Sequence, residues 1–141
     1  MVEGTPVKKN SVSTCAHFLV NQTSSDTFKI KYTAISHRNN QPVTFIVDGT
    51  VSDDILAQWQ LVGYKEAFGP FKHVILSPNY DSSLAMIVCG NGNPRFIPRG
   101  EIAMIWSRQK TLPEAELNDL KTKLGEYIDK ETLLPVNNIN C

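Results

Sequence analysis

Alternation of apolar and polar residues marks two segments of the chain, 28–34, where it is strict, and 55–61. Successive side chains of a β-strand point to opposite faces, so this alternation predicts strands with one buried face. The apolar positions are Phe28, Ile30, Tyr32, Ala34, Ile55, Ala57, Trp59 and Leu61.

Shorter apolar runs predict five further strands, and residues typical of turns separate the whole series. The runs are 16–20, 43–47, 71–76, 84–89 and 102–106. The breaks are 21–26, 36–42, 48–49, 68–70, 77–81 and 90–100. Strands at such even spacing, with tight connections, predict an antiparallel meander folded as a sandwich or barrel. Without an internal repeat or a low-complexity tract, residues 1–141 are predicted to form one domain.

One helix is predicted after the strands. Thr111 and Glu114 have the spacing of a capping box, and Pro113 falls in the first turn, where its missing N–H costs little. An apolar stripe then recurs at helical spacing. It consists of Leu117, Leu120, Leu124 and Ile128. A helix after a run of strands more often covers the outside of its own sheet than binds a partner, so we expect the stripe to pack there.

Composition excludes some partners. Lys plus Arg and Asp plus Glu both total 14, which gives no net charge, and 20% of residues are charged. Without a basic patch, nucleic acid is a poor candidate partner. No apolar run reaches the roughly 18–20 residues that cross a bilayer. Residues 1–6 show no apolar signal-peptide region, which by itself would favour the cytosol.

The three cysteines, Cys15, Cys89 and Cys141, have no CxxC or Cys/His metal spacing. Cys141 follows the polar run 137–140 and is better explained as a staple for a loose tail than as a core residue. Three free thiols remain the alternative. Asn21 begins an N-glycosylation sequon, a weak signal because such triplets are common.

The sequence offers little support for a catalytic site. The histidines, His17, His37 and His73, are isolated and lack HExxH spacing. The glycine-rich segment 90–93 lacks the P-loop lysine, and no G-x-S-x-G occurs. We therefore predict no enzyme activity, no cofactor and no metal site.

Several motifs together resemble the lipocalin family, in particular its apolipoprotein D group with the insect Lazarillo and bilin-binding proteins. Residues 75–80 resemble the second family signature, with Pro78-Asn79-Tyr80 in place of the usual Thr-Asp-Tyr. Residues 106–108 resemble the third signature, and residues 112–114 resemble the start of this group's helix. A short strand ending in cysteine follows. The resemblance covers nearly the whole chain and implies an all-β, up-and-down antiparallel barrel with one α-helix packed outside.

The resemblance also implies roles for particular residues. Cys15 and Cys141 correspond to disulfide partners in the group, which leaves Cys89 unpaired and available for dimer formation. Arg108 corresponds to an arginine that closes the barrel against a first-strand tryptophan through packing and cation–π attraction. The family's Gly-x-Trp is absent here, so we expect Arg108 to be partly exposed or to find a substitute partner.

Residues 1–6 look like the end of the opening strand of a lipocalin and the loop after it. We therefore expect the chain to begin just past the missing tryptophan, as a truncated product would, with the signal peptide lost. Secretion is then the better expectation. A barrel of seven strands would leave unpaired edges, which favour aggregation.

Alternation predicts an apolar, aromatic barrel interior. The inward residues are Phe28, Ile30, Tyr32, Phe45, Trp59, Leu61, Leu84, Met86, Met104 and Trp106. An eight-stranded barrel has room for one small ligand, so we predict an extracellular carrier of a fatty acid, sterol, retinoid or tetrapyrrole pigment. A packed core without ligand is one alternative. Two others are a thiol enzyme resembling prostaglandin D synthase, with a reduced, inward Cys15, and a receptor-binding immune or stress module.

Overall fold

The computed structural model describes residues 1–6, 12–36, 39–52, 58–63, 71–79, 81–90, 101–139 and 141. Its strands are β1 Glu3–Gly4, β2 Thr14–Gln22, β3 Thr27–Ile35, β4 Pro42–Ser52, β5 Gln58–Gly63, β6 Phe71–Asn79, β7 Ser83–Cys89, β8 Glu101–Ser107 and β9 Leu134–Pro135. The helix α1 spans Glu114–Leu124, and a 3-10 turn, η2, spans Lys130–Thr132.

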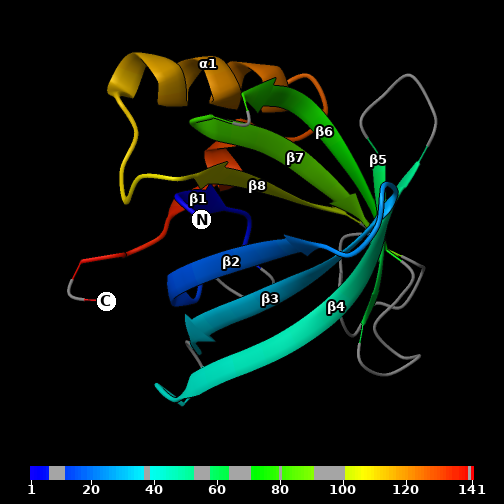
Figure 1. Cartoon of the computed structure of the whole chain (residues 1–141). Helices are drawn as coiled ribbons and strands as arrows, with labels where there is room; N and C mark the ends of the chain where they lie inside the picture. Colours follow the sequence, from blue (N-terminus) through cyan, green and yellow to red (C-terminus); the bar gives the residue numbers. More distant parts are fainter. Residues whose placement is uncertain are drawn as a thin grey trace.

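All the described strands belong to one sheet, in the order β2-β3-β4-β5-β6-β7-β8-β1-β9, and each pairing is antiparallel. The sheet curls so that β2–β4 and β6–β8 form two arms joined through β5 (Figure 1). This confirms the predicted all-β antiparallel architecture with one helix. Residues 1–6 contain β1, which pairs with β8 and with β9.

The two faces of the sheet carry separate clusters of apolar residues. On the concave face, the buried members are Phe28, Ile30, Ile75, Leu84, Met86, Val88 and Trp106. On the convex face, Ala85, Ile87, Ala103 and Ile105 pack against residues of α1 and the segment after it. The strict alternation along β7 and β8 therefore assigns one set of side chains to the interior and the other to the helix.

Helix α1 lies across the convex side of β6–β8 (Figure 1), as the stripe predicted. Leu120 and Leu124 are buried there over Ala85 and Ala103, whose small side chains allow close approach. Polar contacts flank this apolar centre. Lys121 Nζ lies 3.1 Å from Glu3 Oε2, Lys123 Nζ donates to Ser77 Oγ, and the Ser82 and Ser83 hydroxyls donate to Glu116 Oε1.

The capping box is not formed. Pro113 is the N-cap residue, two positions after the expected Thr111, and no side chain caps the first turn. Glu114 and Glu116 instead place negative charge near the helix N-terminus, where the helix dipole favours it. The Ser83 and Ser82 hydroxyls bind the Glu116 carboxylate and hold its pKa below the usual range.

Two predicted strand ends are wrong. β4 does not stop at Asp48-Gly49 but continues to Ser52, paired with β3 on one side and β5 on the other. Within this ladder Asp48 Oδ1 lies 2.6 Å from Lys29 Nζ. β6 runs through the predicted turn 77–81 as far as Asn79. A bulge between Ile75 and Ser77 shifts the register, which allows a proline to pair within the strand.

Other boundaries differ less. β2 includes Asn21 and Gln22, which the sequence assigned to a turn. β5 begins at Gln58, and positions 55–57 of the predicted strand lie outside the described residues, as do 91–100 of the predicted loop.

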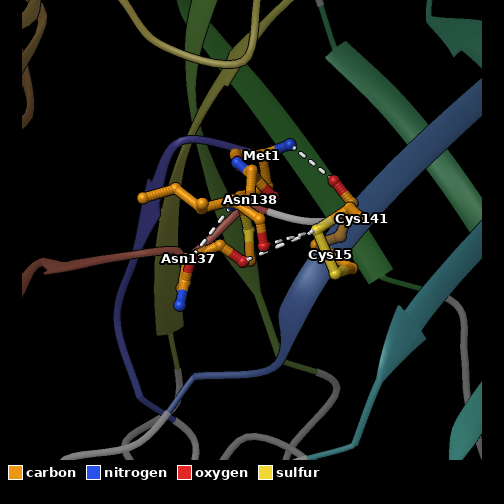
Figure 2. Close-up of a disulfide and its surroundings, with 7 residues drawn as sticks. Met1, Cys15, Asn137, Asn138 and Cys141 are labelled. Atoms are coloured by element: carbon orange, nitrogen blue, oxygen red, sulfur yellow. Dashed lines mark hydrogen bonds between the residues drawn. A yellow bond between two sulfur atoms is a disulfide. The ribbon is translucent and has the colours of Figure 1, made fainter.

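The two ends of the sheet meet at a seam, defined here as residues 1, 136–139 and 141 against the start of β2 (Figure 2). Cys15 and Cys141 form a disulfide with Cα atoms 5.4 Å apart, the pairing that the resemblance implied. The Cys15 N–H donates to the Asn137 carbonyl, and the Met1 nitrogen donates to the Ala16 carbonyl. Cys15 has a φ of 52°, a left-handed conformation unusual for a non-glycine residue, and it lies within the irregular step between Thr14 and His17.

Replacing Cys15 and Cys141 together by serine should lower the free energy of unfolding by about 4–5 kcal/mol, since the bridge closes a long loop. Urea titration of the unreduced wild type and the double variant measures the difference. Cys89→Ser, on the convex face, is the matched control and should cost far less. A thiol assay should find one free cysteine before reduction and three after it. A loss below about 1 kcal/mol would show that the seam does not depend on the bridge.

Candidate ligand-binding site in the barrel

Most of the predicted interior residues meet in one cluster on the concave face. Phe28, Ile30, Leu84, Met86 and Trp106 are buried in it, and Trp59 and Met104 pack against it partly buried. The residues come from β3, β5, β7 and β8, which are distant in sequence but brought together by the curl of the sheet. The clustering agrees with the alternation argument, whereas ligand binding by these residues stays a prediction.

The other three predicted interior residues lie at or beyond the edge of this cluster. Tyr32 and Phe45 are opposite each other on β3 and β4, with stacked rings 4.5 Å apart. Tyr32 is half-buried, whereas Phe45 is 49% exposed. Leu61 pairs with Gly49 and Phe71, and its side chain lies outside the described part of the structure.

Aromatic contacts connect the two arms across the interior. Phe18 on β2 stacks on Trp106 of β8, with ring centroids 3.7 Å apart, and also contacts Tyr32 at 4.8 Å. The sequence treated residues 16–20 only as an apolar run and missed Phe18. Phe18 and Ala16 are two positions apart and therefore alternate onto the same face of the strand. That this face is the inward one follows only once Phe18 is known to lie opposite the inward residue Tyr32.

A second aromatic contact lies beside Gly49. It is buried on β4 between Phe28 of β3 and Leu61 of β5, in the row of inward positions. Next to it in the ladder, the Phe28 ring meets the Trp59 ring with centroids 5.1 Å apart and an edge-on geometry. The glycine read as a strand break therefore lies within β4, beside this aromatic contact.

His73 is the polar residue that sequence reasoning missed. It lies on β6 opposite Trp59 and Val88, both part of the concave-face packing, and it is 5% exposed. Its Nδ1 is 3.3 Å from the Phe71 carbonyl oxygen. Burial lowers the pKa of His73 to about 4. The available signal was that His73 shares its parity with Phe71 and Ile75, but the segment was read as an apolar run.

Comparison with known proteins gives a match in structure and none in sequence. No protein-family model matches the chain, and no curated protein matches it. Lobster apocrustacyanin A1 superposes with a TM-score of 0.75 at 14% identity, over 96% of this chain and 73% of that one. The siderocalin Ex-FABP gives 0.73 at 12% identity, over 96% and 89%. A biogenic amine-binding protein gives 0.66 at 15% identity, over 95% and 74%.

These neighbours share the curled antiparallel sheet and the helix. The chain has the lipocalin fold. In this fold the concave face of the sheet is the interior of a barrel, so the cluster that contains Trp59, Met86 and Trp106 lines it.

The remaining predicted residues lie outside the barrel of this lipocalin fold. Cys89 is unpaired and half-buried on the convex side, between Lys72 and Glu101 in the ladder. Arg108 is exposed, and its backbone N–H donates to the Ser82 carbonyl. Asn21 is exposed on β2 opposite Lys29, where a glycan would be accessible. Their roles in dimer formation, stability and glycosylation stay predictions.

Outside the barrel, two other kinds of site come into question among the described residues, namely surface pockets and metal centres. A pocket of about 390 Å³ opens outside the barrel, lined mainly by Thr5, Pro6, Ile102 and the turn after α1. Its acidic residues are Glu101, Glu126 and Asp129. Within the described ranges, no three His, Cys, Asp or Glu side chains gather in a way that could hold a metal ion.

The buried histidine makes a prediction about acid stability. In the unfolded chain His73 takes up a proton below its usual pKa of 6.5, whereas the folded state resists protonation down to about 4. The free energy of unfolding should therefore fall as the pH falls through this window, by about 3 kcal/mol from this residue.

Urea titrations of wild type and His73→Phe at pH 7.5 and 4.5 isolate that contribution, because the other titrating groups are common to both proteins. Between pH 7.5 and pH 4.5, the free energy of unfolding should fall by about 2–3 kcal/mol more in wild type than in the variant. Equal losses in the two proteins would mean that His73 is solvated in the folded state.

Proposed function

We propose that this chain is a carrier that binds one small lipophilic molecule inside its lipocalin barrel. The observation that carries the proposal is apolar surface left exposed on the concave face. Phe45 is 49% exposed, Val20 46% and Val51 43%, and each is the ladder partner of an inward residue: Tyr32, Ile30 and Trp59 respectively.

This exposure favours a binding cavity over a filled core. Interiors that serve only stability are close-packed, and inward side chains in them are buried. Here the concave face is packed around Met86 and Trp106 but open towards β4. Covering such surface with an apolar ligand would gain roughly 25 cal/mol per Å² without any catalytic step. Two indoles and two thioethers on the same face suit ligands of irregular shape.

The structural neighbours support the proposal through their fold. One is a biogenic amine-binding protein, and the siderocalin Ex-FABP functions through dual ligand specificities. The motifs around residues 75–80 and 106–114 favour the apolipoprotein D group, and thus a fatty acid, sterol, retinoid or tetrapyrrole as cargo.

An extracellular setting is part of the proposal. It is supported by the disulfide between Cys15 and Cys141, since such bridges persist mainly in oxidising compartments. Among the described helical residues, no helix has the length and apolar character needed to cross a membrane.

Thiol catalysis is the less favoured function. A lipocalin-type thiol enzyme would need a reduced cysteine facing the interior. Cys15 is bonded to Cys141, and Cys89 packs against the convex cluster rather than the concave one. Both placements support a carrier.

Intrinsic fluorescence tests the carrier directly, because Trp59 and Trp106 are the two tryptophans of the chain. A panel of fatty acids, sterols, retinoids and bilins should include a ligand that quenches saturably with a Kd on the order of micromolar or tighter. Trp59→Ala should weaken that binding while the fold persists, because a cavity wall tolerates truncation better than a packed core, where it costs about 3–5 kcal/mol.

Leu19→Ala, an exposed position on the convex side of β2, is the matched control and should leave affinity unchanged. The carrier proposal fails if no member of the panel quenches the wild type and Trp59→Ala unfolds the protein.

A further inference from the structure

The interior of the barrel is uncharged wherever the structure describes it. Inward positions follow from the ladder partners of the concave cluster, and no Asp, Glu, Lys or Arg occupies one on the described strands β2–β8. The charged partners on these strands, such as Lys29 and Asp48, belong to the opposite face. An ionised ligand group would therefore lose its hydration without gaining a counter-charge, which is costly.

Besides the Tyr32 hydroxyl near the edge of the concave cluster, two uncharged polar side chains, His73 and Trp106, lie in this interior at different heights. His73 is beside Val88 of β7, whereas Trp106 is beside Leu84. The two β7 residues are four positions apart, about 13 Å along the strand at roughly 3.3 Å per residue. A single small head group therefore contacts one of the two polar groups, not both.

Hydrogen bonding at His73 fixes what its ring offers. The partner of Nδ1 is the Phe71 carbonyl oxygen, which can only accept, so Nδ1 carries the proton. Because burial also lowers the pKa of the ring to about 4, the imidazole is neutral near pH 7. In a neutral imidazole with a protonated Nδ1, Nε2 is a lone-pair acceptor. A ligand that matches it must present a donor.

Trp106 offers the opposite chemistry. It is 9% exposed, and its indole Nε1–H is buried with no hydrogen-bond partner among the described residues. An orphaned buried donor costs free energy that a ligand acceptor would recover. His73 thus supplies a hydrogen-bond acceptor and Trp106 a donor, both without charge.

From this arrangement we infer that the barrel selects an uncharged apolar ligand bearing a hydroxyl group, whose O–H donates to His73 Nε2. The Trp106 Nε1–H donates a hydrogen bond to an acceptor atom further along the ligand. The inference rests on the proposed carrier function and narrows its cargo to alcohols, in preference to the carboxylates and esters of the same hydrocarbon.

Three retinoids with one hydrocarbon skeleton test the head group: retinol, retinyl acetate and retinoic acid. Titrated into the full chain at pH 7.5, retinol should bind about five- to tenfold more tightly than retinyl acetate, the range expected for one hydrogen bond. Retinoic acid, ionised at this pH, should bind at least about tenfold more weakly than retinol. Nile red, uncharged and without a donor, serves as a probe of the cavity itself.

His73→Phe should remove the preference, lowering retinol affinity to that of retinyl acetate while the affinity for the ester stays within about twofold. His17→Phe, an exposed histidine on the convex side of β2, is the control and should keep the preference. Nitrogen-15 NMR of the wild-type histidine side chains supplies a readout that needs no variant. His73 should be the Nδ1–H tautomer, and its Nε2 resonance should move upfield when retinol binds.

The outcomes separate the two proposals. Equal affinities for retinol and its acetate, tighter binding of retinoic acid, an Nε2–H tautomer, or Nile red binding without retinol binding would each overturn the alcohol preference and leave a carrier. If His73→Phe weakens the binding of retinol and of retinyl acetate equally, His73 contributes to packing alone. If neither Nile red nor any retinoid binds, the carrier function itself fails, and the alcohol preference with it.

Discussion

Closure of the curled sheet is the constraint on which the interior depends. A sheet that ends in two free edges offers no interior, and this one is closed by a small set of contacts between β2 and the chain's two ends. The disulfide from Cys15 to Cys141 and the hydrogen bond from Cys15 to Asn137 fix one point of the seam. The stacking of Phe18 on Trp106 fixes another from inside. With both in place, apolar residues of two distant arms share one concave surface.

The opposite face has a simpler organisation, which explains why it was easier to predict. The stripe of α1 needs only an apolar surface beside it, and Ala85 and Ala103 provide one at close range. Local spacing therefore indicated the helix, its face and its location. The helix start was less predictable: it begins after Pro113 rather than after Thr111, and the Ser82 and Ser83 hydroxyls, brought near by folding, bind Glu116 in its first turn.

Interior residues were predictable where alternation was clean and not elsewhere. Phe28, Ile30, Met86 and Trp106 followed from a period of two. His73 and Phe18 did not, because a strand read as a continuous apolar run has no assigned face until its neighbour fixes the register. Gly49 was misread for a related reason. Its local preference favours a turn, whereas here it is paired with both neighbouring strands inside β4.

The unequal support of the two arms has a mechanical consequence. Helix α1 braces β6–β8 from outside, whereas β2–β4 are held by the ladder to β5 and by the seam. A pull applied to the carboxyl end reaches Cys141 before it reaches the sheet, and the covalent bridge transmits it to the unbraced arm. A tether or a neighbouring domain attached there would therefore load β2 first and leave the helix-backed arm unstrained.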